Sequence, residues 1–187
     1  MKKEFNPRMH SAEHILNQSM HRMFGCGRCF SAHIEKKKSK CDYHYNRDVS
    51  GDEIKEIERC VNHVIDADFA VTENYIDRGE AKKHYNLERL PSGTEEKIRI
   101  VKIGDYDACP CIGPHVSSTK MIGGFRITST SFKNGVLRAH SKITSHLIRR
   151  CIPPGCVAKA RNIQIFLRFR ALPDGRLNAK YCEFIYS

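Results

Sequence analysis

The chain has 187 residues and a net charge of +11 at a sequence pI near 9.3, and 40% of its residues are hydrophobic. This length suits one domain with or without an appendage. The chain has no apolar run of roughly 18–20 residues and no signal-peptide core at its start, which argues against a membrane span and predicts a cytoplasmic protein.

The first predicted element is a helix. Asn6 is a suitable N-cap, Pro7 fits the first helical position and Gly25 can end the helix. His10 and His14 lie nearly opposite its main apolar stripe, so we expect them to face a site or water rather than the core. That stripe consists of Ala12, Ile15, Leu16, Ser19, Met20 and Met23.

Four further regular elements and a loop are indicated between residues 50 and 103. The capping box Ser50-Gly-Asp-Glu53 predicts the start of a second helix. Alternating hydrophobicity predicts strands over residues 69–76 and 97–103. Residues 77–84 can form a short helix, and residues 90–93 form a loop.

The second half of the chain begins with a hairpin. Alternating residues 125–132 and 136–139 flank Asn134-Gly135, which is a strong signal for a tight β-turn. Residues 163–170 and 176–186 alternate more loosely and can form two further strands.

Charge divides the chain unevenly. Residues 139–187 hold nine Lys or Arg against two acidic residues, so they contribute +7, and the first 138 residues contribute +4. The excess indicates a polyanionic partner, most often nucleic acid, or serves solubility alone. We expect a domain over residues 1–139 and a basic extension over residues 140–187. This extension either grips RNA or forms an additional hairpin.

Two short segments about a hundred residues apart carry metal-binding side chains. His10-Ser-Ala-Glu-His14 lies on the predicted helix, where residues i and i+4 share one face. Cys111-Ile-Gly-Pro-His115 lies in a Gly/Pro-containing turn after a strand. Together they supply four donors, and the mixture of cysteine and histidine favours zinc over magnesium or calcium. The sequence therefore predicts Zn²⁺ bound by His10, His14, Cys111 and His115.

Other cysteines offer two alternatives. Cys26-Gly-Arg-Cys29 has zinc-knuckle spacing and can join Cys109 and Cys111 in a four-cysteine site, although the chain has no second CxxC motif. Cys109 can also replace Cys111 as the thiolate ligand. Nine cysteines without an export signal are better explained by metal ligation and buried thiols than by a disulfide framework.

These motifs carry a resemblance to a known family. The chain resembles the editing domain of alanyl-tRNA synthetase and its free-standing relatives, the AlaX-type trans-editing proteins, and more distantly the editing domain of threonyl-tRNA synthetase. The HxxxH motif of this family matches His10 and His14. Its usual Cys-Gly-Gly-Thr-His-Val matches Cys111-Ile-Gly-Pro-His115-Val116, and the likeness covers roughly residues 5–139.

The resemblance implies a fold and a reaction. The fold is α+β, with helices packed on an antiparallel sheet and the site in the cleft between them. Such proteins hydrolyse the ester that joins a wrong amino acid to the terminal adenosine of a tRNA, and AlaX-type proteins typically clear serine or glycine from alanine tRNA. We therefore expect a zinc-dependent hydrolase whose partner is mischarged tRNA. Because the chain lacks a synthetase catalytic domain, we expect it to act on released tRNA.

Several positions depart from the family pattern. Pro114 replaces the motif threonine and Ile112 the first motif glycine, while Lys120 and Met121 alter the usual Thr-Gly-Glu-Ile-Gly. These changes keep the metal ligands but alter their surroundings. Two alternatives therefore stay open: a non-catalytic zinc-containing tRNA- or RNA-binding module, and a metal-dependent hydrolase of a small ester or amide.

Polar side chains near the motifs are candidates for catalysis or substrate positioning. Each can equally serve ordinary surface or core hydrogen bonding. Four protein donors fill a tetrahedral zinc site, so we expect the metal to orient the tRNA 3′ end while a held water attacks the ester. The candidates are Ser11, Asn17, Gln18, His21 and Thr119.

Overall fold

The computed structural model describes residues 6–87, 90, 96–144, 170–171 and 177–178, and the chain divides into two units at residues 147/148. In the second unit, the described residues form the short antiparallel pair β8 (Arg170–Ala171) and β9 (Leu177–Asn178). The remainder of the two loosely predicted strands, and most of the basic extension, lies outside the described residues.

Helix α1 (Pro7–Phe24) begins and ends where the sequence predicts. The side chain of Asn6 accepts hydrogen bonds from the backbone N–H groups of Arg8 and Met9, which have no partner inside the helix. Gly25 ends the helix in the left-handed conformation with φ of 64°. Local capping chemistry therefore marks both ends of the helix.

Helix α2 (Gly51–Asp66) confirms the predicted capping box. The Ser50 hydroxyl accepts from the Glu53 N–H, and the Glu53 carboxylate accepts from the Ser50 N–H. The predicted short helix is also present as α3 (Arg78–His84).

Four antiparallel strands form the larger sheet, in the order β1-β2-β7-β6. The predicted hairpin across Asn134-Gly135 is confirmed as β6 and β7, and β7 continues five residues beyond the predicted end at Ala139. Strands β1 and β2 were not among the predicted elements: β1 has only four residues, and β2 contains two lysines, Lys38 and Lys40. The strands are β1 (Ser31–Ile34), β2 (Lys38–His44), β6 (Gly124–Lys133) and β7 (Val136–Thr144).

A smaller antiparallel sheet has the order β3-β4-β5. Its strands β3 (Val71–Asp77) and β4 (Lys97–Ile103) match the predictions, whereas β5 (Asp107–Pro110) was not predicted. The chain then continues through the 3₁₀-helix η1 (Thr119–Ile122) into β6. The segment between β5 and η1 carries the second metal-type motif.

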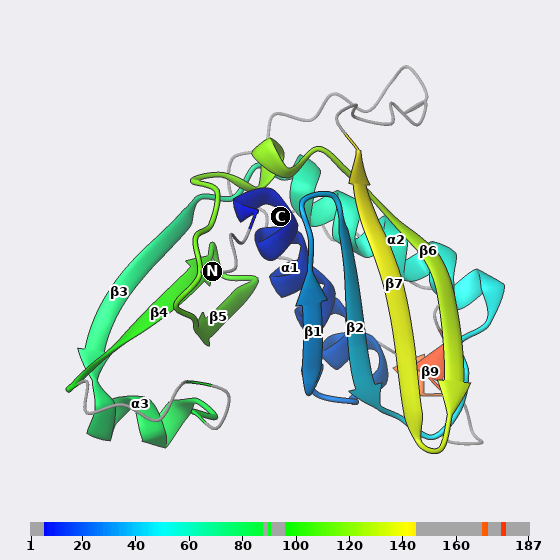
Figure 1. Ribbon diagram of the computed structural model, residues 1–187, viewed down its shortest axis with the longest axis horizontal. Coiled ribbons are helices and arrows are strands. Elements are labelled where there is room, and N and C mark those ends of the chain that lie inside the picture. The colour runs from blue at the N-terminus through cyan, green and yellow to red at the C-terminus, as the bar shows by residue number, and fades with distance from the viewer. Residues whose placement is uncertain (1–5, 88–89, 91–95, 145–169, 172–176, 179–187) are drawn as a thin grey trace. The chain divides into compact units, whose positions relative to one another are not determined.

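Helix α1 connects the two sheets within the first unit, where it contacts β2 and β7 on one side and β5 on the other (Figure 1). Its buried residues join those of α2 and the larger sheet in one hydrophobic core, while a small separate cluster lies under α3. The helices and open antiparallel sheets confirm the predicted α+β class. None of the described helices is long and apolar enough to cross a membrane.

Candidate metal centre and cavity

The structure brings the two metal-type motifs together. His10 and His14 project from α1, Cys111 and His115 come from the segment between β5 and η1, and their candidate ligand atoms lie within 4.8 Å of one another. The Cys111 Sγ atom is 3.3 Å from His10 Nε2 and 3.4 Å from His115 Nε2. Tetrahedral zinc bond lengths place nitrogen and sulfur ligands about 3.5 Å apart. Donor types and spacing therefore fit a zinc ion.

Two of these histidines are oriented through their other ring nitrogen. His10 Nδ1 lies 3.2 Å from the carbonyl oxygen of Pro114, to which it can donate. His115 Nδ1 lies 3.0 Å from the hydroxyl of Ser11, whose backbone is part of α1. Partners of this kind hold a ligating imidazole in one orientation and present its free nitrogen to a metal.

His14 is held by a second group of side chains. Its Nδ1 atom lies 3.5 Å from a carboxylate oxygen of Asp107 and 3.3 Å from the Sγ atom of Cys109. Asp107 in turn accepts two hydrogen bonds from the guanidinium of Arg28, at 2.7 and 3.0 Å. Cys109 thus lies beside His14 in a group with Asp107, whereas Cys111 lies in the four-residue cluster.

The electrostatics favour the metal-binding protonation states of Cys111 and His115. Burial opposes ionisation of Cys111, but hydrogen bonds with His10, His115 and His14 outweigh it and lower the pKa of this thiol to about 3. Burial and the neighbouring histidines lower the pKa of His115 to about 4, although Cys111 acts in the opposite direction. A thiolate and a neutral imidazole are the forms that bind metals.

The second group contains a stabilised ion pair. Burial opposes the ionisation of Asp107, but hydrogen bonds with His14 and Arg28 outweigh it and lower its pKa to about 2. Burial likewise disfavours protonation of His14, yet the charge of Cys109 and the hydrogen bond with Asp107 raise the pKa of His14. Asp107 is therefore an ionised anchor for His14.

Two residues that shape the segment from Cys111 to His115, called the ligand loop below, were not predicted from the sequence. A β-carbon at Gly113 would lie 2.3 Å from Cε1 of His10, so only glycine fits against this ring. Arg99 on β4 donates to the carbonyl oxygens of Cys111 at 3.0 Å and Gly113 at 2.8 Å, and it also pairs with Glu73. The family motif also has a glycine at the position of Gly113, which was a signal for this steric constraint. No pattern in the predicted strand distinguishes Arg99 from its neighbours.

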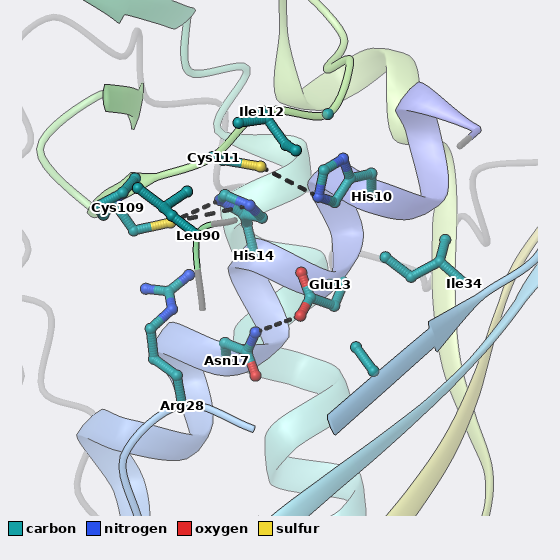
Figure 2. A pocket seen from close by; sticks show the side chains of 13 residues that line it. His10, Glu13, His14, Asn17, Arg28, Ile34, Leu90, Cys109, Cys111 and Ile112 are labelled. Atoms are coloured by element: carbon teal, nitrogen blue, oxygen red, sulfur yellow. Dashed lines mark hydrogen bonds between the residues drawn. The ribbon is translucent and has the colours of Figure 1, made fainter. Parts of the chain in front are cut away.

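A cavity of about 310 Å³ opens beside the cluster (Figure 2). Its volume is at the lower end of those that hold small ligands. Helix α1 and Arg28 provide polar walls, residues 109–113 add two cysteines and the apolar Pro110 and Ile112, and β1 and Leu90 add further apolar surface. The α1 residues that line it are His10, Glu13, His14 and Asn17; the remaining walls include Arg28, Ala32, Ile34, Cys109, Cys111 and Ile112.

Among the predicted helper residues, Asn17 lines this cavity. Its amide nitrogen donates to Glu13 Oε1 at 2.6 Å, and its amide oxygen accepts from the backbone N–H of Cys29 at 3.1 Å. Glu13 is only 4% exposed. It was not predicted as a site residue, because no motif outside the HxxxH pair contains it. Asn17 therefore positions the Glu13 carboxylate.

The other predicted helpers lie in different surroundings. Ser11 is fully buried and contacts His115. Thr119 is also buried, and its hydroxyl donates to the carbonyl oxygen of Val64 at the end of α2. Gln18 is half-buried and His21 is exposed, and neither is among the residues that line the cavity.

The alternative four-cysteine site is not assembled by the described residues. Cys29 lies with Glu13 and Cys41 in another buried group, and no metal-type group in this part of the chain contains Cys26. Of the positions that depart from the family pattern, Ile112 and Met121 have exposed side chains, at 66% and 55%.

Comparisons with known proteins agree with the resemblance. The family described as the threonyl and alanyl tRNA synthetase second additional domain matches residues 98–138. An alanine–tRNA ligase of Aeropyrum pernix is 34% identical over 136 residues, and one of Cenarchaeum symbiosum is 35% identical over 135 residues. A third, from Treponema denticola, is 28% identical over 144 residues.

The aligned region is a small part of these relatives. It covers 70% of this chain but 15% of the Aeropyrum pernix and Cenarchaeum symbiosum ligases. For the Treponema denticola ligase it covers 73% of this chain and 23% of the relative. The similarity is thus to one region of much longer proteins.

Proposed function

We propose, from the premise that this chain carries a domain related to the editing-type domain of alanyl-tRNA synthetases, that it is a zinc-dependent aminoacyl-tRNA hydrolase. Its substrate is an alanine tRNA that carries a wrong small amino acid, serine or glycine. The chain acts in trans, on mischarged tRNA that it binds from solution. The alanine–tRNA ligase relatives and the net charge of +11 support a tRNA partner.

The observation that carries the proposal is the convergence of four donors at the cavity. His10, His14, Cys111 and His115 come from segments about a hundred residues apart, yet their ligand atoms gather within 4.8 Å. A structural zinc site needs no adjoining space, whereas this cluster adjoins a cavity of about 310 Å³. We therefore infer that the site binds both zinc and a small ligand group.

The reaction we propose is ester hydrolysis. The oxygen of water bonds to the carbonyl carbon, the bond between this carbon and the ribose oxygen breaks, and a proton passes to the ribose oxygen. When bound, zinc supplies positive charge that orients the 3′ end and stabilises negative charge on oxygen. The chain's own side chains hold the ion, and the apolar residues Ala32, Ile34 and Ile112 restrict the size of the amino acid.

A second candidate is a zinc-containing RNA-binding module without catalysis. One observation favours it: Pro114 contributes no backbone N–H to the loop between Cys111 and His115, which removes one possible donor for an oxyanion. This module would bind tRNA with strong salt dependence and leave the ester intact. A metal-dependent hydrolase of small esters is the third candidate, and it would ignore the tRNA.

The test is deacylation of seryl- and glycyl-tRNA specific for alanine, measured with zinc-loaded and metal-stripped protein. We expect zinc-dependent release of one of these amino acids, with correctly charged alanyl-tRNA cleaved far more slowly. Cys111→Ser should abolish release, and Cys60→Ser, which changes a half-buried thiol outside the cluster, should not. Salt-sensitive tRNA binding without release would replace the proposal with the RNA-binding module. Cleavage of free aminoacyl esters at the same rate would favour the third candidate.

A further inference from the structure

The two carboxylate oxygens of Glu13 have different surroundings. Oε1 accepts hydrogen bonds from the Asn17 amide at 2.6 Å and from the Cys29 thiol at 3.3 Å. Oε2 accepts none from the described residues, although the side chain is buried and lines the cavity. In Figure 2, one oxygen is turned toward Asn17 and the other toward the side of the cavity where His10 and His14 lie.

Among the described residues, the hydroxyl of Tyr43 is the only fully enclosed side-chain oxygen or nitrogen without a partner, so Glu13 Oε2 keeps access to the cavity. A ligand that displaces water from this oxygen must supply a donor in its place, because an unpaired buried carboxylate is costly. Arg28 also lines the cavity, but its guanidinium is engaged with both oxygens of Asp107, at 2.7 and 3.0 Å. Asn17 and Cys29 meanwhile hold the Glu13 carboxylate in place. The Glu13 carboxylate is thus a fixed acceptor in the cavity, and its Oε2 atom can accept a hydrogen bond from a cationic ligand.

We propose that Glu13 binds the α-ammonium group of the aminoacyl ester and makes the site specific for a free amine. This inference rests on the proposed function. In an aminoacyl ester, the carbon that bears the ammonium group is bonded directly to the ester carbonyl carbon. Glu13 lines the same cavity as His10, His14 and Cys111, so an ammonium group on its carboxylate places the carbonyl beside the four-residue cluster.

As a consequence, the site would distinguish a substrate with a free, charged amine from one whose amine is acylated. A charged ammonium forms short, charge-assisted hydrogen bonds with a carboxylate. An N-acylated amine, as in a peptidyl ester, has no charge and a single N–H, so it leaves the buried carboxylate poorly paired. Sites built around such a polar contact reject analogues that lack it far more strongly than apolar pockets reject a size change. The site would therefore spare peptidyl-tRNA.

Binding of two stable analogues tests this directly. Both carry serine joined by an amide to 3′-amino-3′-deoxyadenosine, one with a free α-amine and the other with an acetylated one. Calorimetry with zinc-loaded protein should give about 10- to 100-fold tighter binding of the free amine, the range expected for a hydrogen bond to a charged group. Glu13→Gln should remove this preference by weakening only the free-amine analogue. Glu58→Gln, which alters another buried glutamate on α2, should retain it.

The outcomes separate this inference from the proposed function. Equal affinity of wild-type protein for the two analogues overturns the role of Glu13 without any variant, and so does a Glu13→Gln protein that keeps the preference. Zinc-dependent release from seryl-tRNA and N-acetyl-seryl-tRNA at the same rate would leave the hydrolase intact and refute the amine site. Failure to bind either analogue would overturn the amine site, and failure to release any amino acid would overturn the hydrolase.

Discussion

At the scale of single residues, the metal cluster depends on very close packing between α1 and the ligand loop. Gly113 faces the His10 ring, and a methyl group at this position would overlap Cε1 and Nδ1 at 2.3 and 2.6 Å. Real β-carbons do not approach other heavy atoms so closely, so either the loop or the ring must move. Because Nδ1 of His10 also contacts the carbonyl oxygen of Pro114, both parts would be displaced together.

We expect Gly113→Ala to lower the zinc affinity by about 10-fold or more, because it displaces a ligand rather than removing one. Competition with a chromogenic chelator measures this affinity. Gly79→Ala is the matched control, since no atom lies within 4 Å of its added β-carbon, and it should bind zinc like the wild type. Unchanged affinity in Gly113→Ala would contradict the ligand role of His10.

Asp107 offers a second test at this scale, because it orients His14 without joining the four-residue cluster. Asp107→Asn keeps the shape but removes the charge that anchors the His14 ring and the Arg28 guanidinium. We expect zinc affinity to fall about 10- to 100-fold, as for other residues that orient metal ligands. Asp105→Asn, an exposed neighbour, should have no effect. A drop in both variants would point to net charge instead of orientation.

The sequence predicted those site residues whose spacing carries the information. His10 and His14 are one helical turn apart, and Cys111 and His115 bracket a glycine-containing turn, so each pair is recognisable locally. Arg99 and Glu13 were missed because their roles arise from tertiary contacts. An arginine in a strand and a glutamate in a helix have no local signal that reveals which distant carbonyl or cavity they meet.

At the scale of elements, the same distinction between local signals and tertiary contacts holds. Capping chemistry is local, and the ends of α1 and the start of α2 were predicted correctly from Asn6, Gly25 and Ser50. Strand β1 was missed because it has only four residues, and β2 because lysine is an unusual strand residue. Both are stabilised by tertiary pairing, β1 with β2 and β2 with β7. Their order beside β7 brings together segments that are about a hundred residues apart.

That pairing places basic residues in a row on the larger sheet. Lys38 pairs with Lys142, which pairs with Arg126, and all three side chains are exposed. Like charges directly opposite each other on neighbouring strands lower the stability of a sheet. A polyanion would relieve this repulsion, so we expect the row to contact tRNA phosphates.

Replacement of Lys38, Arg126 and Lys142 by glutamine should therefore weaken tRNA binding without lowering the thermal stability. The melting temperature should rise or stay constant as repulsion is removed. The tRNA affinity should fall, and the slope of its logarithm against the logarithm of salt concentration should become shallower by about 0.7–0.9 for each phosphate that the protein no longer neutralises. Lys82, Lys97 and Lys102, which are exposed outside this sheet, form the control triple. An equal fall of affinity in the control would show that only total charge matters.

At the scale of the whole molecule, the metal cluster joins distant parts of the first unit. Two candidate ligands belong to α1, which packs on the larger sheet, and two belong to the loop that follows the smaller sheet. An ion held by all four would restrain both sheets relative to α1. Since the unfolded chain cannot reproduce such a cluster, binding energy becomes folding energy.

We expect zinc to raise the melting temperature and a chelator to lower it. A free zinc concentration 100 times the dissociation constant should add about 2.7 kcal/mol to the free energy of unfolding. Thermal denaturation followed by circular dichroism measures the shift, and His115→Ala should show a smaller one. If magnesium stabilised the protein as well as zinc, the proposed donor set would be wrong.

The three residues between Cys111 and His115 differ in how freely they can vary. Position 114 contacts His10 through its backbone carbonyl oxygen. Every amino acid has this group, so proline can replace the threonine of the family motif and keep the interaction. Position 112 carries a side chain that is 66% exposed and lines the cavity, so a change there alters the cavity without displacing the metal ligands. Of the three positions, only position 113 has no room for a side chain. A search for distant relatives should therefore require cysteine, glycine and histidine at this spacing and accept any residue at the other two positions.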